Sequence, residues 1–260
     1  MENIEIIPAI LPKNFEELEQ KLIWLKGAFL VLGDELGPTR PTLKGGSGRP
    51  FVQIDICDGR FVPSKTWPFT GEEQSISQLA VWADDFDFEI DLMVENPIEL
   101  IEDWQKIERL NELSRSSIYR VVMHIENLVG EKSEDLAATA AKSSDFSPTS
   151  LTQFGIALNP NTPTEKIARY LSKIDFVQFM GINKIGYQGQ AFNPEVVSKI
   201  QKFRAQNSNI IISIDGGVNL ENIKDLIDAG VNRAVVGSAI FQSDNPNDMA
   251  KIIKALEEII

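Results

Sequence analysis

Apolar residues in this chain come in short runs, and amphipathic stretches separate one run from the next along the whole sequence. The runs have the length of buried strands, and the stretches between them repeat apolar residues at helical spacing. The runs predict strands near Ile4–Leu11, Phe51–Ile56, Phe86–Met93, Ile118–His124, Gln153–Leu158, Phe176–Met180, Ile210–Ile214 and Ala234–Val236. The stretches predict helices near Phe15–Ala28, Glu72–Ala83, Pro97–Leu110, Glu134–Lys142, Thr164–Ser172, Pro194–Ala205, Leu220–Ala229 and Pro246–Ile259.

Strands that alternate with helices in this way favour βαβ units and a parallel sheet. The 260 residues suit one large domain better than two small ones. Eight such units in about 250 residues match a (β/α)8 barrel, the TIM barrel. We therefore expect residues 1–260 to form a single α/β domain with this fold, and its chemistry to lie at the C-terminal ends of the strands.

Two segments interrupt the alternation. Gly33–Pro50 is rich in glycine and proline and follows the first predicted helix, which places it on the barrel face opposite the active site. Glu126–Ser150 contains a polar helix flanked by SSDFSPTS. Because strands and helices alternate again after each segment, we interpret them as irregular insertions near residues 33–50 and 126–150, and not as domain linkers.

The net charge of the chain limits the classes of partner that it is expected to bind. A net charge of -13 argues against nucleic acid and anionic membranes, which proteins bind mainly through lysine and arginine. No apolar run approaches the ~18–20 residues of a membrane span, and the start, MENIEIIPAIL, lacks the basic residues of a signal peptide. We expect a cytoplasmic protein, and a homo-oligomer stays open.

The rarity of cysteine and histidine limits the chemistry. Cys57 is the one cysteine, so the chain has no internal disulfide and no cysteine-based zinc site. His124 is the one histidine, which removes most histidine-based metal sites and catalytic triads. Carboxylates must therefore carry most of any catalysis.

Acidic residues and glycines gather where the predicted strands end. Asp55 closes the second strand, and Asp58 with Gly59 is expected to shape the turn that follows. Asp91 lies in the third strand, and Asp215 begins DGGV after the seventh. The carboxyl ends of barrel strands meet on one face, so we expect these carboxylates to converge.

Several motifs together resemble the ribulose-phosphate 3-epimerase family. PAIL, QIDICDGRFVP, DLMVENP, GINKIGYQGQAFNP, SIDGGVNLENI and VGSAIF occur in the order, and near the spacing, of that family. The resemblance covers nearly the whole chain apart from the two irregular segments. It implies a TIM barrel and an isomerase of pentose phosphate metabolism that epimerises a ketopentose phosphate. The implied partner is a small phosphorylated sugar.

The resemblance also assigns roles to individual residues. It implies that Asp55 and Asp215 are the acid/base pair that transfers protons at C3 of the substrate. In the family, two histidines and the same two aspartates hold a divalent metal. Gln53 and Asp91 stand at the two histidine positions here, so the resemblance implies an altered metal site.

The residue types at this site suggest which ion it would take. Amide and carboxylate oxygens suit Mg²⁺, Mn²⁺ or Ca²⁺ better than Zn²⁺. Gln53, Asp55, Asp91 and Asp215 are therefore the expected ligands of an all-oxygen site. The alternative is a metal-free site, in which three close carboxylates repel one another and at least one keeps its proton.

Glycine-rich segments are expected to hold the phosphate. Gly216–Gly217 after the seventh strand and Gly237–Ser238 after the eighth match the usual phosphate site of a barrel. The glycine-rich loop after the sixth strand is expected to be a lid that grips the phosphate. The loop departs from the family's PGFGGQ, because Tyr187 stands for the phenylalanine and Gln188 for the next glycine. The expected phosphate-binding residues are Gly186, Gly189, Gly216, Gly217, Gly237 and Ser238.

Three functional hypotheses follow from these patterns. The leading one is a sugar-phosphate epimerase with an altered metal site. The second is a metal-free enzyme that acts on a related phosphosugar. The third is a divergent sugar-phosphate-binding protein without epimerase activity, and turnover of a sugar phosphate would separate it from the two enzymes.

Overall fold

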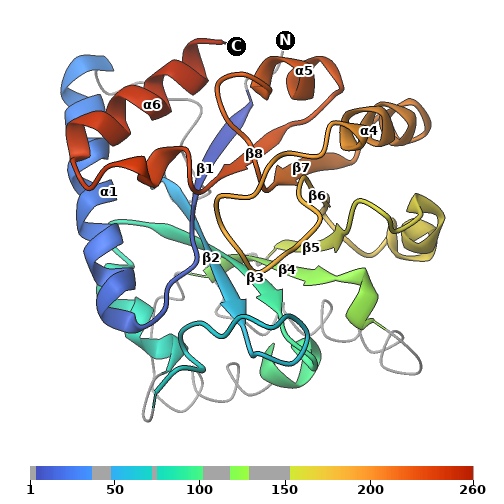
Figure 1. The fold of residues 1–260 in the computed structure, drawn as a ribbon, viewed down its shortest axis with the longest axis horizontal. Coiled ribbons are helices and arrows are strands. Elements are labelled where there is room, and N and C mark those ends of the chain that lie inside the picture. Colours follow the sequence, from blue (N-terminus) through green and yellow to red (C-terminus); the bar gives the residue numbers. More distant parts are fainter. Residues whose placement is uncertain (1–3, 37–47, 72–74, 102–117, 129–152, 260) are drawn as a thin grey trace.

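A computed structural model describes residues 4–36, 48–71, 75–101, 118–128 and 153–259. The strands lie within those ranges and form a closed parallel barrel in the order β1-β2-β3-β4-β5-β6-β7-β8, which confirms the expected TIM barrel (Figure 1). They are β1 (Glu5–Ile10), β2 (Phe51–Cys57), β3 (Asp87–Met93), β4 (Ile118–His124), β5 (Gln153–Leu158), β6 (Phe176–Met180), β7 (Ile211–Asp215) and β8 (Arg233–Val236).

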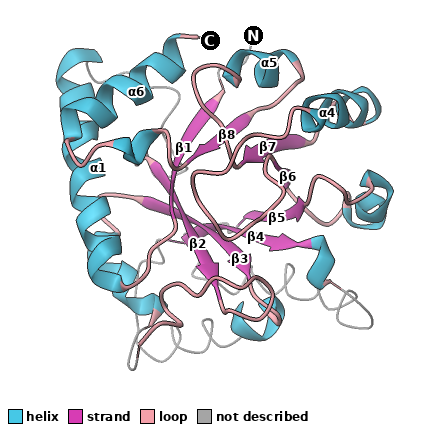
Figure 2. Cartoon of the chain, in the orientation of Figure 1, coloured by secondary structure: helices cyan, strands magenta, loops and turns pink. Residues whose placement is uncertain are grey.

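Helices surround the ring of strands (Figure 2). The helix α1 packs against α6, so the first and last helices lie side by side (Figure 1). The described α-helices are α1 (Phe15–Leu36), α4 (Glu195–Gln206), α5 (Ile223–Asp228) and α6 (Pro246–Glu258). The described 3-10 helices are η1 (Ile76–Trp82), η2 (Ile125–Asn127), η4 (Thr164–Tyr170) and η5 (Ile240–Gln242). Among the described helices, none combines the length and the apolarity that a membrane span requires.

Several predicted helices differ from the observed elements. The helix α1 continues to Leu36, eight residues beyond its expected end, and so enters the expected insertion near 33–50. The segments Ile76–Trp82 and Thr164–Tyr170 are 3-10 helices, which suits short connectors that cannot sustain an α-helix of their own. Residues 97–101 are helical as expected. The rest of that helix, most of the insertion near 126–150 and the helix near Glu134–Lys142 lie outside the described residues.

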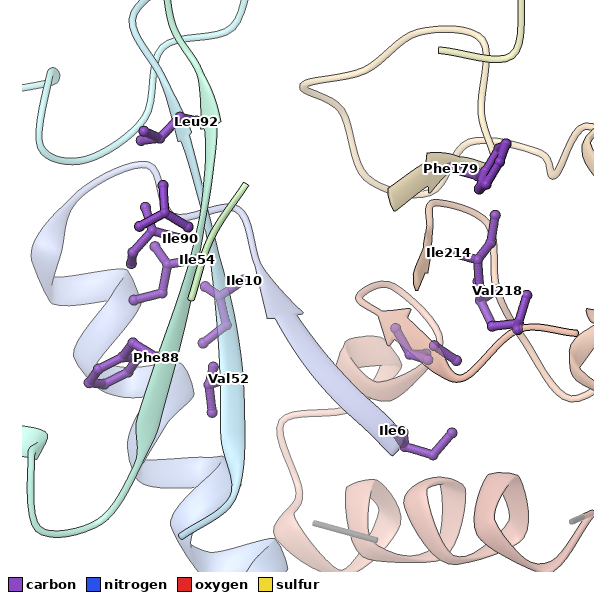
Figure 3. Packing of buried hydrophobic residues seen from close by; sticks show 14 of the residues in the cluster. Ile6, Ile10, Val52, Ile54, Phe88, Ile90, Leu92, Phe179, Ile214 and Val218 are labelled. Atoms are coloured by element: carbon purple, nitrogen blue, oxygen red, sulfur yellow. The ribbon is translucent and has the colours of Figure 1, made fainter. Parts of the chain in front are cut away.

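The strands divide the core into two parts by their alternation. Val52 and Ile54 of β2 belong to the large cluster between the barrel and its helices, together with Phe88 and Ile90 of β3 (Figure 3). Neighbouring residues point to the other face of the strand. Gln53 and Asp55 of β2, and Glu89 and Asp91 of β3, therefore lie in the barrel interior. Buried polar residues thus alternate with buried apolar residues along both strands.

The lower interior, at or near the N-terminal ends of the strands, holds an ionic network. Arg120 Nη1 lies 3.1 Å from Glu5 Oε2 and 3.6 Å from Glu89 Oε2. Arg233 Nε lies 3.2 Å from the same Glu5 oxygen. Both arginines donate to Gln153 Oε1, at 3.2 and 3.1 Å. Two carboxylates and two guanidinium groups thus lie together below the active-site end of the barrel.

Candidate active site

Three aspartates meet in the upper interior, at the end of the barrel where the strands point. The register of β2 and β3 pairs Asp55 with Asp91, and Asp215 is the last residue of β7. One carboxylate oxygen from each lies within 4.8 Å of the others. All three residues are buried. The convergence expected from the strand ends is therefore present.

The amide of Gln53 joins two of these aspartates. Its Nε2 donates to Asp55 Oδ1 at 2.7 Å and to Asp215 Oδ2 at 2.8 Å. Gln53 precedes Asp55 by two residues on β2, so both side chains point into the barrel. Both hydrogens of this nitrogen are used. The Gln53 amide therefore spans β2 and β7 and fixes the two carboxylates relative to each other.

Two further residues hold the third aspartate. Gln178 Nε2 donates to Asp91 Oδ2 at 3.1 Å and, over a longer 3.4 Å, to Asp215 Oδ2. His124 Nε2 lies 3.0 Å from Asp91 Oδ1. No role was predicted for Gln178 from the sequence. A glutamine inside the apolar strand FVQFM was the available sign for Gln178, because a buried polar side chain needs a partner.

Burial and mutual repulsion change the proton affinities of the cluster. Burial, together with the charge of Asp91, raises the pKa of Asp55 to about 8 against the opposing hydrogen bond from Gln53. Burial and the charges of Asp55 and Asp91 raise the pKa of Asp215 well above its usual value. Burial alone would lower the pKa of His124, but the charge and hydrogen bond of Asp91 outweigh it and raise this pKa. The cluster thus holds protons near neutral pH.

The same cluster is suited to a cation. Three carboxylates with their oxygens within 4.8 Å of one another could bind a metal ion, and oxygen ligands are those that hard divalent ions prefer. The charges around the cluster agree with this, since the three aspartates have one histidine and two neutral amides as neighbours. Gln53 presents its N–H2 group to Asp55 and Asp215, while its Oε1 is buried and has no hydrogen-bond partner in the part of the chain that the structure describes.

The expected phosphate-binding residues line one pocket beside the aspartates. Gly216 and Gly217 follow β7 with φ of 102° and 71°, a region that favours glycine. A Cβ on Gly217 would also lie 2.8 Å from the backbone of Phe192. The pocket lining brings together Asp55, Asp215 and all six expected residues, Gly186, Gly189, Gly216, Gly217, Gly237 and Ser238.

The second strand ends in the turn that the sequence predicted. Asp58 Oδ1 accepts hydrogen bonds from the backbone N–H groups of Arg60 and Phe61 at 2.8 and 3.1 Å. Its Oδ2 accepts from Glu95 N at 2.8 Å. Gly59 has a φ of 78°. Asp58 therefore shapes the loop after β2 and ties it to the loop after β3, and the reacting cluster does not include it.

Comparison of the sequence with known proteins identifies a family. A model of the ribulose-phosphate 3 epimerase family matches residues 39–241. Ribulose-phosphate 3-epimerase of Mycobacterium bovis is 32% identical over 207 residues, which cover 77% of this chain and 79% of that protein. The enzyme of the same name from Bacillus subtilis is 28% identical over 242 residues, covering 88% and 94%.

Solved structures confirm the fold independently. A tryptophan synthase structure from Mycobacterium tuberculosis has a TM-score of 0.64 at 12% identity, with 99% of this chain and 93% of that one covered. A protein of Aquifex aeolicus has a TM-score of 0.63 at 16% identity, with 100% and 93% covered. Likeness at such low identity shows the barrel alone, whereas the sequence matches are more specific. By its motifs and these relatives, the chain belongs to the ribulose-phosphate 3-epimerase family.

Proposed function

We propose that this protein epimerises a ketopentose phosphate by transferring protons at C3, with Asp55 and Asp215 as the acid/base pair. The observation that carries the proposal is their arrangement: two buried aspartates from β2 and β7, joined by one amide, beside a glycine-lined pocket. A positioned acid and base with proton affinities near the working pH are what such a reaction requires.

The raised proton affinities support a division of labour between the two groups. In one direction, the ionised aspartate removes the C3 proton while the other, still protonated, delivers a proton to the opposite face. Because epimerisation is reversible, each aspartate is the base in one direction and the acid in the other. The N–H groups of Gln53 stabilise whichever carboxylate is ionised and keep the pair at a fixed separation.

A divalent cation fits this proposal in the position defined by Asp55, Asp91 and Asp215. When bound, it supplies positive charge for substrate oxygens that become negative as the proton leaves. Mg²⁺, Mn²⁺ or Ca²⁺ suits these oxygen ligands better than Zn²⁺. Gln53 would add a fourth oxygen only after its amide turns over, since its N–H2 group now faces the carboxylates.

The orientation of Gln53 favours a second candidate, a metal-free enzyme on this or a related phosphosugar. The amide donates to Asp55 and Asp215, two of the three aspartates that would hold a cation. Neutral donors would then replace the cation as the stabilising groups. This candidate keeps the acid/base pair and changes only what neutralises the developing charge.

One experiment tests both enzyme candidates. The purified protein is incubated with ribulose 5-phosphate in deuterated water, and NMR follows exchange at C3 after chelation and then with each divalent ion added. Exchange restored by an ion supports the metal enzyme, and undiminished exchange in chelator supports the metal-free one. Asp228→Asn, at an exposed residue paired with Lys224, is the control that should keep full exchange. No exchange under any condition, with sugar-phosphate binding retained, would leave a binding protein.

A further inference from the structure

The loop between β6 and α4 lies across the mouth of the barrel (Figure 1). Its two ends are fixed, because Gly181 N donates to Asp215 O at 2.6 Å and Asn193 N donates to Gly181 O at 2.7 Å. In between, Ser64 Oγ donates to Gly186 O and ties the loop to the segment after β2. The loop is thus held over the pocket in a defined position.

Gln188 links this loop to the end of β1, which lies three strands from β6 around the barrel. Its Nε2 donates to Ala9 O, at the end of β1, at 3.1 Å. A Cβ on Gly237, the first residue after β8, would lie only 2.8 Å from the same nitrogen. Gln188 also lines the pocket with Gly217 and Ser238. Its amide nitrogen therefore lies beside the residues that are expected to bind the phosphate of a ligand.

The donor capacity of this amide is only partly used. A side-chain amide nitrogen carries two hydrogens, and among the described residues Ala9 O is the acceptor that Gln188 Nε2 has. The described residues that line the pocket include neither lysine nor arginine, and they include Asp55 and Asp215. A phosphate in this pocket must therefore be held by neutral donors, so each available N–H contributes substantially.

We propose that Gln188 is a substrate-positioning residue that donates its second N–H to the phosphate of the bound ligand while the first stays on Ala9 O. The inference rests on the proposed sugar-phosphate function and deepens it. The loop after β6 then contacts the ligand through a side chain, at a position where the family's loop pattern PGFGGQ has a glycine. One residue both completes the phosphate site and links the loop to β1 and β8.

The test compares Gln188→Leu and Gln188→Glu with the wild type by calorimetry, with inorganic phosphate and ribulose 5-phosphate as ligands. Leucine removes the donor at similar size, so the Kd for both ligands should rise about 10- to 100-fold. Glutamate keeps the shape and adds a negative charge facing the phosphate, so its Kd should rise further. In turnover, KM should rise more than kcat falls.

The control is Lys184→Leu, at an exposed residue in the same loop outside the pocket lining, which should bind both ligands as the wild type does. Thermal melting without ligand checks that every variant is folded. Wild-type affinity in Gln188→Leu would overturn the inference. An equal loss in the leucine and glutamate variants would also overturn it, because it would indicate a link to Ala9 without contact to phosphate.

The same data separate this inference from the proposed function. If the wild type binds ribulose 5-phosphate without turnover, and the leucine and glutamate variants lose affinity as expected, Gln188 positions the phosphate and the epimerase proposal fails. If the wild type turns the sugar over and Gln188→Leu matches it, only the Gln188 inference fails. A wild type that binds neither ligand would overturn both.

Discussion

The barrel interior contains two polar clusters that differ in charge balance. In the lower cluster, Glu5 and Glu89 face Arg120 and Arg233, so acidic and basic groups are equal in number. In the upper cluster, the described hydrogen-bond partners of Asp55, Asp91 and Asp215 are two glutamine amides and His124, and no lysine or arginine is among them. In the lower cluster each carboxylate lies near an arginine, whereas the three carboxylates of the upper cluster have His124 as their one basic hydrogen-bond partner among the described residues.

This difference indicates which cluster is structural and which is chemical. The arginines of the lower cluster also stack on aromatic rings, with Arg120 3.5 Å from the centroid of Phe51 and Arg233 4.7 Å from that of Phe176. The upper cluster instead opens into the pocket lined by Asp55 and Asp215. The charge of its three carboxylates must be balanced by protons, a cation or hydrogen-bond donors, which are the means of acid/base chemistry.

The largest expected effect concerns the upper cluster. Asp55→Asn or Asp215→Asn should reduce C3 exchange by about 10³-fold or more, because a general acid/base contributes 10²–10⁴-fold and each group serves in both steps. At pH 8 and without metal, either variant should also be more stable by roughly 2 kcal/mol or more, since a repelling carboxylate is gone. Kinetics and thermal melting give the two readouts. A variant that loses both activity and stability would contradict the inference that the three carboxylates repel one another in the absence of metal.

In the lower cluster, the opposite outcome is expected from removing a charge. Arg120→Met would leave Glu5 and Glu89 without their shared partner and should destabilise the fold by about 3–5 kcal/mol. The folded variant should retain C3 exchange. Lys224→Met, which breaks an exposed pair with Asp228, is the matched control and should cost less than about 1 kcal/mol. Urea unfolding measures both, and equal losses would contradict the buried network.

A smaller effect is expected where the upper cluster is held together. Gln53→Leu removes the donor to Asp55 and Asp215 and should reduce stability at pH 8 by about 1–3 kcal/mol. It should also move the acidic limb of the exchange–pH profile to higher pH, because the ionised carboxylates lose their hydrogen bonds. An unchanged profile would show that the amide does not set the proton affinity of the pair.

The smallest effect for a single step of the measurement, one pH unit, is the pH dependence of stability in chelated wild type. The pKa of Asp55 is raised to about 8 from 3.8, so between these values the folded protein keeps a proton that the unfolded chain releases. Stability is then fully present below about pH 4 for this group and falls as pH rises toward 8, by about 1 kcal/mol per unit. Urea midpoints at pH 6, 7 and 8 measure it, and Asp55→Asn should flatten the slope.

Much of this architecture could be predicted from the sequence. Alternating runs gave the barrel, and the strand ends gave Asp55, Asp91 and Asp215, because parallel strands bring their carboxyl ends to one face. Gln178 was missed, since its partners lie on β3 and β7 and depend on the register of a closed sheet. The direction of the Gln53 amide was equally inaccessible. A glutamine can present either its N–H2 group as a donor or its oxygen as a ligand, and the neighbouring groups determine which of the two faces the site.

The hydrogen bonds from Gln53 to Asp55 and Asp215 hold these carboxylates without help from a bound ion. A bound ion dissociates, competes with other ions and depends on its concentration in the surroundings. A side chain that donates to Asp55 and Asp215 is attached to the same polypeptide, and its amide does not titrate. The carboxylates of Asp55 and Asp215 are therefore held at one spacing by the polypeptide itself, whatever the supply of metal ions.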